Sequence, residues 1–517
     1  MQAFLSRFGG LVLAVLSGFD RLRFRGASRL LCNARGAQSY LYQHGLRFTD
    51  YRRHTEQLTR TLVRGTEALA AAEGDRVHYL NSPNTDKEAT ALAIAQRRGL
   101  RSGRVAVLSC VEGCRTYRVR KNDRGHIDLV AEPARCQHFY HYFLHEDLGP
   151  CYVRVQSWFP FTVRVGLNGR QWLYRQLQRE GLGYRCQDNL LVAVDDWRRA
   201  QQLLDQQPHA DWPALLDRLA APAQPLWPYL RDEARVPYYW VTEQSEWATD
   251  VLFRTPADLA ELYPRLTRHA ITVLGCRDVL RFLGRRVPRE GFGRTAGEVK
   301  ADYAERCEGV RVKFWHGVNS VKAYDKFGQG LRLETTINQA GPFKAYRAKE
   351  GDADGPRAWQ RLRKGVADLP RQAEISQRAN ERLAESLATS ADTTPLGKLL
   401  EPLARPVVQG GRRTRALNPL AGPDGALLRA IAQGDFLLQG FRNRDLRLAL
   451  YGEPADGAER RRQSARVTRQ LGLLRAHGLI VKVQKTHRYQ LSAQGRRVVT
   501  ALLSAYAADA TRLASAG

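Results

Sequence analysis

Acidic residues are scarce in this 517-residue chain. Its 52 Asp and Glu residues stand against 81 Lys and Arg residues, which gives a net charge of +29 and an isoelectric point of about 10.2. So large a positive excess repels itself unless a polyanion neutralises it, and we therefore expect a nucleic-acid partner, DNA before RNA. A GC-rich genome that favours Arg is the alternative explanation. A long basic helix with a clean apolar face is also lacking, which argues against a membrane partner.

Long hydrophobic runs are lacking as well. The apolar run FGGLVLAVLSGF, Phe8–Phe19, has 12 residues, which is too short to cross a bilayer. The basic stretch DRLRFRG follows it where a signal peptide would have a cleavage site, so we expect a buried strand. Eight cysteines are ordinary usage for a reducing compartment. These features predict a cytoplasmic protein with free thiols.

The motifs of several enzyme classes are absent. The chain has no P-loop, no GxGxxG, no Ser-His-Asp signature and no HExxH, which argues against ATP-driven, dinucleotide-dependent and ordinary hydrolase functions. Zinc is not expected, because the residues that could bind it are spaced too loosely for a structural zinc site. These residues are Cys110, Cys114, Cys136, His138, His141 and His145.

The alternation of apolar and polar residues predicts an α+β protein with a mixed or antiparallel-sheet body and a C-terminal winged helix-turn-helix domain. A chain of this length exceeds a single hydrophobic core. We expect an N-terminal α+β domain over 1–220 and a β-rich domain over 236–346. A helix and a Pro/Gly/Arg-rich linker over 355–425 then lead to the winged helix over 426–517.

Three of the predicted strands lie in the first half of the chain. Arg104–Gly113 and Thr116–Asn122 alternate in polarity and predict two separate strands, and Tyr238–Phe253 predicts a long aromatic one. The turn Trp158–Phe161, with arginines nearby at Arg154 and Arg164, could stack unpaired bases. Packing of these aromatic rings in the core is the alternative.

The C-terminal segment has the most specific order of elements. A short helix, a short strand at Phe436–Phe441 and a helix at Asn443–Gly452 precede a long basic helix at Glu459–Ile480. Two strands, Ile480–Gln484 and Arg488–Ser492, then enclose a basic tip. This is the order of a winged helix, in which the third helix enters the major groove and the wing touches the backbone.

The stretch LLRAHGLIVKV, Leu473–Val483, with HRYQLSAQGRRVV after it, resembles the passage from recognition helix to wing in MarR-like and other bacterial winged-helix proteins. In the long helix, the spacing of Val467, Leu471 and Leu474 predicts a core-facing stripe. Protein docking is the alternative use of such a domain. The predicted nucleic-acid contacts are Arg461, Arg462, Ser464, Arg466, Thr468, Arg469, Arg475, Lys482, Lys485, His487 and Arg488.

The stretch NSVKAYDKFGQGLRLETTIN, Asn319–Asn338, predicts two strands joined by a glycine turn. In the second strand, Leu331–Ile337, apolar residues line one face, and Arg332 and Glu334 lie on the opposite, outward face. Lys322 and Tyr324 of the first strand can oppose them. This polar face is either solvated or catalytic.

The pattern S-x-K-x-Y-D-K, a short turn and L-R-x-E resembles a segment of the rolling-circle replication initiators of plasmids and phages. The resemblance covers about 20 residues, and the His-hydrophobe-His triplet of one branch of that family is absent. It implies a metal-dependent nicking domain with a tyrosine nucleophile. The candidate catalytic residues are Tyr324, Glu334, Arg332, Lys322 and Lys326. The candidate ligands for Mg²⁺ or Mn²⁺ are Glu246, Asp250, Asp325 and Glu334.

Blocks such as LSGFDRLRFRG, Leu16–Gly26, and QSEWATDVLF, Gln244–Phe253, resemble a multicopy family of uncharacterised bacterial proteins, which implies an association with mobile elements. The expected function is therefore that of a nucleic-acid-binding protein of a mobile element, with metal-dependent nicking or replication initiation as its candidate activity. A non-enzymatic transcriptional regulator and an RNA-binding partner of a structured RNA are the alternatives.

Overall fold

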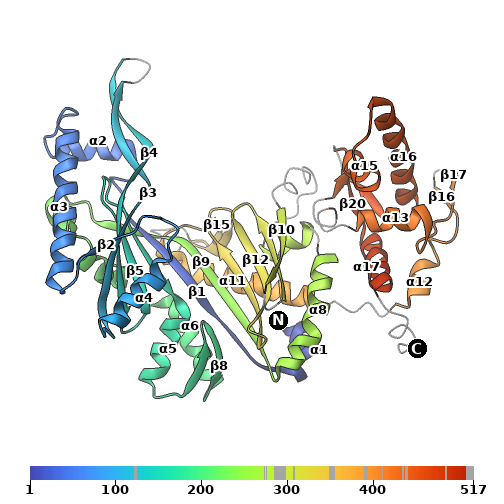
Figure 1. The fold of residues 1–517 in the computed structure, drawn as a ribbon, viewed down its shortest axis with the longest axis horizontal. Helices are drawn as coiled ribbons and strands as arrows, with labels where there is room; N and C mark the ends of the chain where they lie inside the picture. Colours follow the sequence, from blue (N-terminus) through green and yellow to red (C-terminus); the bar gives the residue numbers. More distant parts are fainter. Residues whose placement is uncertain are drawn as a thin grey trace. The chain divides into compact units, whose positions relative to one another are not determined.

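The computed structural model describes the whole chain except residues 122–124, 273, 275, 285–298, 307–308, 349–354, 389–393, 410, 433–435, 437–439, 484–485 and 508–517. The chain forms two compact units. Figure 1 labels their helices and strands. Unit 1 comprises Met1–Val15, Thr249–Thr335 and Ile375–Gly517, and unit 2 comprises Leu16–Ala248 and Thr336–Glu374. Neither unit is a single consecutive segment.

The main structural element is a mixed sheet of 11 strands in the order β10-β11-β12-β13-β9-β1-β6-β5-β4-β3-β2. Strand β2 pairs with β3 in parallel, whereas the pairs β3–β4, β4–β5, β5–β6 and β6–β1 are antiparallel. The predicted α+β class is therefore confirmed. The strands are β1 Val12–Ser28, β2 Val77–Tyr79, β3 Gly103–Lys121, β4 Ile127–His145, β5 Gly149–Gln156, β6 Val163–Asn168, β9 Tyr238–Phe253, β10 Val299–Arg306, β11 Gly309–His316, β12 Asn319–Lys326 and β13 Gly330–Ile337.

The hydrophobic core of unit 2 contains Phe24, Phe159 and Trp212, and helices of this unit bury side chains in it. Helix α3 buries Tyr51, Leu58, Leu62, Thr66 and Ala70, whose spacing of about two turns and then one turn makes a single stripe. The helices of this unit are α2 Ala34–Gln43, α3 Tyr51–Ala72, α4 Lys87–Arg97, α5 Gly169–Arg179, α6 Trp197–Gln206 and α7 Trp212–Ala220. Two short hairpins, β7 Tyr184–Gln187 with β8 Leu190–Val194 and β14 Lys344–Arg347 with β15 Ala358–Arg361, complete it.

In unit 1, helix α11, Leu369–Ala388, packs on one face of strand β13. Asn380, which is fully buried, donates to the carbonyl of Leu333 and to Thr249 Oγ1, each at 3.1 Å. Its Oδ1 accepts from Thr335 Oγ1 at 2.7 Å. These bonds satisfy polar groups that burial would otherwise leave unpaired. The other helices of this part are α1 Gln2–Phe8, α8 Pro256–Thr272 and α9 Cys276–Phe282.

The C-terminal part of unit 1 has a core of its own, which contains Phe441, Val467 and Leu474. Its three-stranded sheet has the order β18-β20-β19. The elements are α12 Leu396–Leu400, β16 Val407–Gln409, β17 Arg412–Thr414, α13 Gly422–Ile431, β18 Phe441–Arg442, α15 Asn443–Tyr451, α16 Gly457–Ala476, β19 Ile480–Lys482, β20 Arg488–Leu491 and α17 Ala493–Ala507.

Several predicted elements differ in extent from the observed ones. Strand β9 has the predicted bounds, but the two strands expected between Arg104 and Asn122 are one continuous strand, β3. The apolar run at Phe8–Phe19 is strand only from Val12, because α1 and a 3-10 turn precede it. Much of the strand expected at Phe436–Phe441 falls outside the described residues. Within the described chain, every helix is too short or too polar to cross a membrane.

Candidate nucleic-acid interface

Helix α16 is the basic helix that the sequence predicts. It begins after Asp456, whose Oδ1 accepts from the backbone N–H of Glu459 at 2.7 Å and so caps the first turn. Val467, Leu471 and Leu474 are buried, as their spacing predicted, and Leu473 is buried as well. The opposite side of the helix is left to solvent.

That solvent side carries arginines. Arg461, Arg462, Arg466, Arg469 and Arg475 are all exposed. The helix carries a single acidic residue, Glu459, whose Oε2 lies 3.9 Å from Arg462 Nη1. The guanidinium of Arg466 also lies over the ring of Tyr451, 5.8 Å from its centroid. An exposed helix with so little neutralising charge is a strong local source of positive potential.

Ser464 and Thr468, two further predicted contacts, hold α16 against α15. Asn443 Nδ2 donates to the carbonyl of Ser464 and to Thr468 Oγ1, each at 3.0 Å, and Ser464 Oγ donates back to Asn443 Oδ1 at 3.0 Å. Thr468 remains exposed, whereas Ser464 is half-buried. Ser464 therefore positions the helix.

The hairpin after α16 supplies further cations. Lys482 on β19 and His487 beside β20 are exposed. Arg488 is half-buried and donates to the carbonyl of Gly440 at 3.1 Å. Lys485, also a predicted contact, lies outside the described residues.

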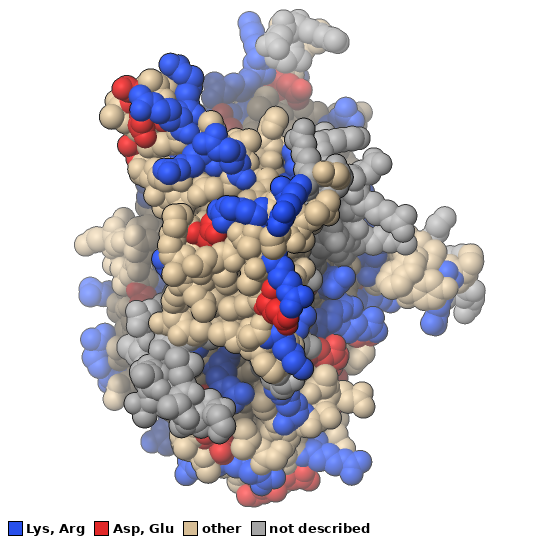
Figure 2. All heavy atoms as spheres, turned by 90° about the vertical axis from the view of Figure 1, so that its right-hand side faces the viewer, with Lys and Arg blue, Asp and Glu red and all other residues tan. Residues whose placement is uncertain are grey.

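Positive charge dominates this part of the chain. Between Arg442 and Arg497 there are 14 Lys and Arg residues and 4 Asp and Glu residues, a difference of 14 − 4 = +10. Figure 2 shows one face of the molecule, on which Lys and Arg side chains are widespread and Asp and Glu side chains are few. A polyanion would find few repulsive groups on this face.

The predicted catalytic strands β12 and β13 have a different character. All eight residues of β13 are buried, and Arg332 and Glu334 are 0% and 1% exposed. The expectation of an outward polar face is therefore wrong. The alternation of polar and apolar residues does separate two faces, but both are covered. Side chains of β9 and β12 pack on Arg332 and Glu334, and helix α11 packs on the other face.

Arg332 forms a bidentate ion pair with Asp250 on β9. Its Nε donates to Asp250 Oδ1 at 2.5 Å and its Nη2 to Oδ2 at 3.0 Å. Both side chains are almost completely removed from solvent. The parallel fork geometry satisfies both carboxylate oxygens, as a buried Arg–Asp pair requires.

Glu334 is bound by two other candidate catalytic side chains, Lys322 and Tyr324. Lys322 Nζ lies 2.7 Å from Glu334 Oε1, and Tyr324 OH donates to Glu334 Oε2 at 3.0 Å. The ammonium group of Lys322 also lies 5.0 Å from the centroid of the Tyr324 ring. The structure thus brings Lys322, Tyr324 and Glu334 together, and it places Lys326 against the ring of Phe327 instead.

Of the predicted metal ligands, Asp325 accepts from the backbone N–H of Gly328 at 2.8 Å and so holds the turn between β12 and β13. In unit 2, Glu246 and Asp20 offer carboxylate oxygens within 4.8 Å of each other. Gln244 donates to Glu246 at 2.6 Å. Asp20 did not stand out in the sequence. The one available signal was an acid in the middle of the apolar strand β1.

Comparison with protein-family models, with curated proteins and with solved structures gave no match to the chain.

Proposed function

We propose that residues 422–507 form a winged helix that binds duplex DNA. The observation that carries the proposal is the set of six exposed arginines of α16, which are the five predicted contacts and Arg460, on a helix with a buried apolar stripe. In this arrangement α16 enters the major groove and the β19–β20 hairpin contacts the sugar-phosphate backbone. Arginines on such a helix can read guanine edges as well as neutralise phosphates.

The centre of the same helix face carries small residues. Ala465 and Gly472 are exposed between the arginines, and no neighbouring atom of the described residues lies within 4 Å of the place where a Cβ of Gly472 would be. Small residues there let the helix backbone approach base edges while longer side chains reach to either side. The major groove of A-form RNA is too deep and narrow to admit a helix, which favours duplex DNA over duplex RNA.

The test compares the full-length protein with Arg461→Ala/Arg469→Ala in binding to a labelled mixed-sequence duplex. The matched control is Arg101→Ala/Arg198→Ala, which removes two exposed arginines of unit 2 and changes the net charge equally. We expect affinity to fall about 10- to 100-fold in the α16 variant and to stay near wild type in the control. Equal losses in both variants would show that net charge, not α16, accounts for binding.

We also propose strand nicking as a second function, on one observation. Tyr324 OH lies 3.0 Å from a Glu334 oxygen, so the carboxylate could accept the phenol proton as the tyrosine oxygen attacks a phosphodiester. A phosphotyrosine bond would form, the bond from phosphorus to one sugar oxygen would break, and Glu334 would return the proton to that leaving oxygen. The test incubates wild type and Tyr324→Phe with single-stranded DNA in Mn²⁺ or EDTA. A protein-linked product that needs Mn²⁺ and disappears in Tyr324→Phe would support nicking. Intact DNA in every reaction would leave a non-enzymatic DNA-binding regulator.

A further inference from the structure

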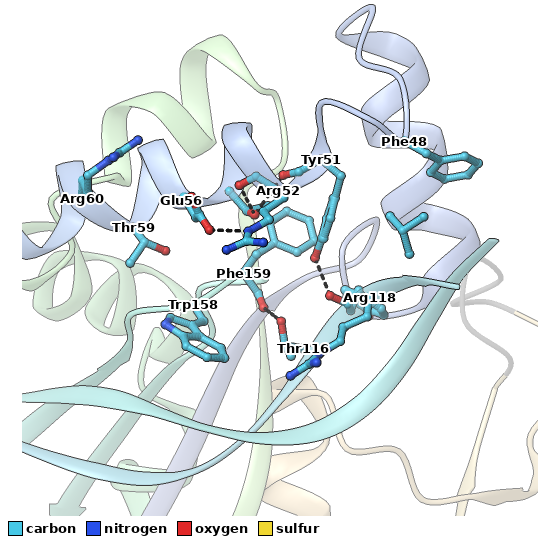
Figure 3. Close-up of a pocket in the computed structure, with 13 residues that line it drawn as sticks. Phe48, Tyr51, Arg52, Glu56, Thr59, Arg60, Thr116, Arg118, Trp158 and Phe159 are labelled. Atoms are coloured by element: carbon cyan, nitrogen blue, oxygen red, sulfur yellow. Dashed lines mark hydrogen bonds and ion pairs between the residues drawn. The ribbon is translucent and has the colours of Figure 1, made fainter. Parts of the chain in front are cut away.

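A pocket of about 820 Å³ opens in unit 2 between helix α3 and strand β3 (Figure 3). The turn at Trp158 and Phe159 closes a third side. In the view of Figure 3, Arg60 and Trp158 lie toward one end of the pocket, and Phe48 and Arg118 lie toward the other. Among the described residues that line it, none belongs to α16 or to the β19–β20 hairpin. It is thus a different site from the proposed duplex-binding surface.

The floor of the pocket is fixed by hydrogen bonds. Tyr51 OH donates to the carbonyl of Tyr117 and Thr116 Oγ1 to the carbonyl of Phe159, each at 2.9 Å. At the rim, Thr59 Oγ1 donates to the carbonyl of Ser157 at 3.0 Å. Burial raises the pKa of Tyr51 above its usual range, so its hydroxyl stays a neutral donor. The pocket is therefore formed before any ligand arrives, which lowers the entropic cost of binding.

Trp158 stands out from its neighbours on this turn. Its side chain is 38% exposed, whereas Phe159 and Phe161 are 2% and 0% exposed. Its backbone carbonyl is held by Phe161 N and by Gln156 Nε2, each at 2.9 Å. An indole on a fixed backbone at the edge of a pocket offers a flat apolar face to another flat ring, and nucleic-acid bases are such rings.

The charge of the pocket lining suits an anionic ligand. Arg52 and Arg60 of α3 and Arg118 of β3 line it, and Glu56 is the one acid among the described lining residues. Arg52 pairs with Glu56 at 2.8 Å and Arg118 pairs with Glu132, but the side chains of the two arginines are 88% and 57% exposed. Exposed ion pairs of this kind are weak, so a phosphate can replace the carboxylates. Threonine hydroxyls lie between the cations and the aromatic rings. Cations, hydroxyls and an exposed aromatic ring are the groups that single-strand binders use.

We propose that this pocket binds unpaired nucleotides of a single-stranded nucleic acid, with a base stacked on Trp158 and the phosphates near Arg52, Arg60 and Arg118. A duplex cannot occupy it in this way, because its bases are stacked on one another inside the helix. The volume falls in the range of small-ligand pockets and so takes one or a few nucleotides of a strand. The site would give a duplex-binding protein a separate contact with melted or looped strand.

The test uses the full chain, a labelled 12-nucleotide single-stranded DNA, the same sequence as RNA, and free AMP as a competitor. Trp158→Ala is expected to weaken single-strand binding between about 5-fold and 150-fold, and Trp158→Phe to weaken it less. Trp359→Ala is the matched control, because Trp359 is 63% exposed on β15 and lies among the basic residues Lys344 and Arg361. It should leave the affinity unchanged. The stronger of the DNA and RNA arms identifies the strand.

Three results would overturn the proposal: full single-strand affinity in Trp158→Ala, an equal loss in Trp359→Ala, or displacement of the strand by AMP at equal nucleotide concentration. If Trp158→Ala shows an altered thermal melting curve, Arg118→Glu replaces it, since that side chain is exposed. The two binding sites separate cleanly. Arg461→Ala/Arg469→Ala should lose duplex and keep single strand, and the Trp158 variant should do the reverse.

Discussion

The surface of α16 and the interior of strands β9, β12 and β13 are both rich in cationic side chains, yet they use them in opposite ways. On α16 six arginines face solvent, and the helix carries a single acid, Glu459. In the strands, Arg332 and Lys322 are held by Asp250 and Glu334 away from solvent. A buried cation with its own carboxylate serves the fold, whereas an exposed row without carboxylates is available to a partner.

The comparison predicts its largest effect on stability at the Arg332–Asp250 pair. Arg332→Ala should lower the free energy of unfolding by about 3–5 kcal/mol, because Asp250 would stay buried without a counter-charge. Urea denaturation of the full chain measures this decrease. The double change Arg332→Met/Asp250→Leu should recover much of it. The exposed pair Arg405–Glu401 is the control, and Arg405→Ala should cost less than about 1 kcal/mol.

A half-buried carboxylate, Glu112, should make stability depend on pH. Although burial opposes ionisation of Glu112, a hydrogen bond from Tyr140 and the charges of Arg154 and Lys87 lower the pKa of its carboxyl to about 2. The contacts are 2.8 Å to Tyr140, 2.8 Å to Arg154 and 3.2 Å to Lys87. Because the folded pKa lies below the unfolded value, this stability is present above about pH 4.5 and is lost as pH falls toward 2.

Because solvent screens this partly exposed carboxylate, the amount at stake is on the order of 1–2 kcal/mol. Denaturant titrations between pH 7 and pH 3 should show a smaller decline for Glu112→Gln than for wild type. Glu401→Gln, a change in an exposed ion pair, should follow the wild-type curve. Parallel curves for all three proteins would mean that the ionised carboxylate of Glu112 does not stabilise the fold.

Replacing the exposed arginines should change the salt dependence of DNA binding but not the free energy of unfolding. Arg461→Ala/Arg469→Ala should reduce the slope of log affinity against log salt by about 1 for each phosphate that the variant no longer neutralises. Its free energy of unfolding should stay within about 0.5 kcal/mol of wild type. Binding titrations from low to physiological salt measure the slope. If the variant were destabilised, the arginines of α16 would contribute to the stability of the fold, as the buried cations of the strands do.

Within the buried strands, a smaller effect than at Arg332 is expected at Tyr324. Tyr324→Phe removes one hydrogen bond to Glu334 and leaves the Lys322 ion pair in place, so it should cost about 1 kcal/mol of stability. Thermal unfolding with and without Mn²⁺ measures this cost. A loss of nicking with no change in stability would move this cluster from the structural side of the comparison to the functional one.

The sequence was a good guide wherever local pattern decides structure. Strand β9 has its predicted bounds, and α16 buries the three residues that its spacing selected. Both elements have a strong period, of two residues for the strand and 3.6 for the helix. The exposure of the α16 arginines follows from the same pattern.

Long-range packing decides what the sequence could not. The alternation in β13 is the same whether its polar face meets water or other strands, so the burial of Glu334 depends on β9 and β12. Ser464 looked like a free contact because its partner, Asn443, lies 21 residues earlier in the chain. Asp20 is one acid in an apolar strand, and only folding brings it near Glu246.

Unit 1 is assembled from three separate segments of the chain, and this constrains how the chain can fold during synthesis. The backbone N–H of Arg254 donates to the carbonyl of Leu11 at 2.9 Å, and the amino terminus pairs with Glu385 at 3.3 Å. The first 15 residues must therefore wait, without their final partners, until the ribosome has made most of the protein. Unit 2 can assemble most of its core in the meantime. We expect slow, ordered folding in which the N-terminus docks last, since contacts of such high sequence separation form late.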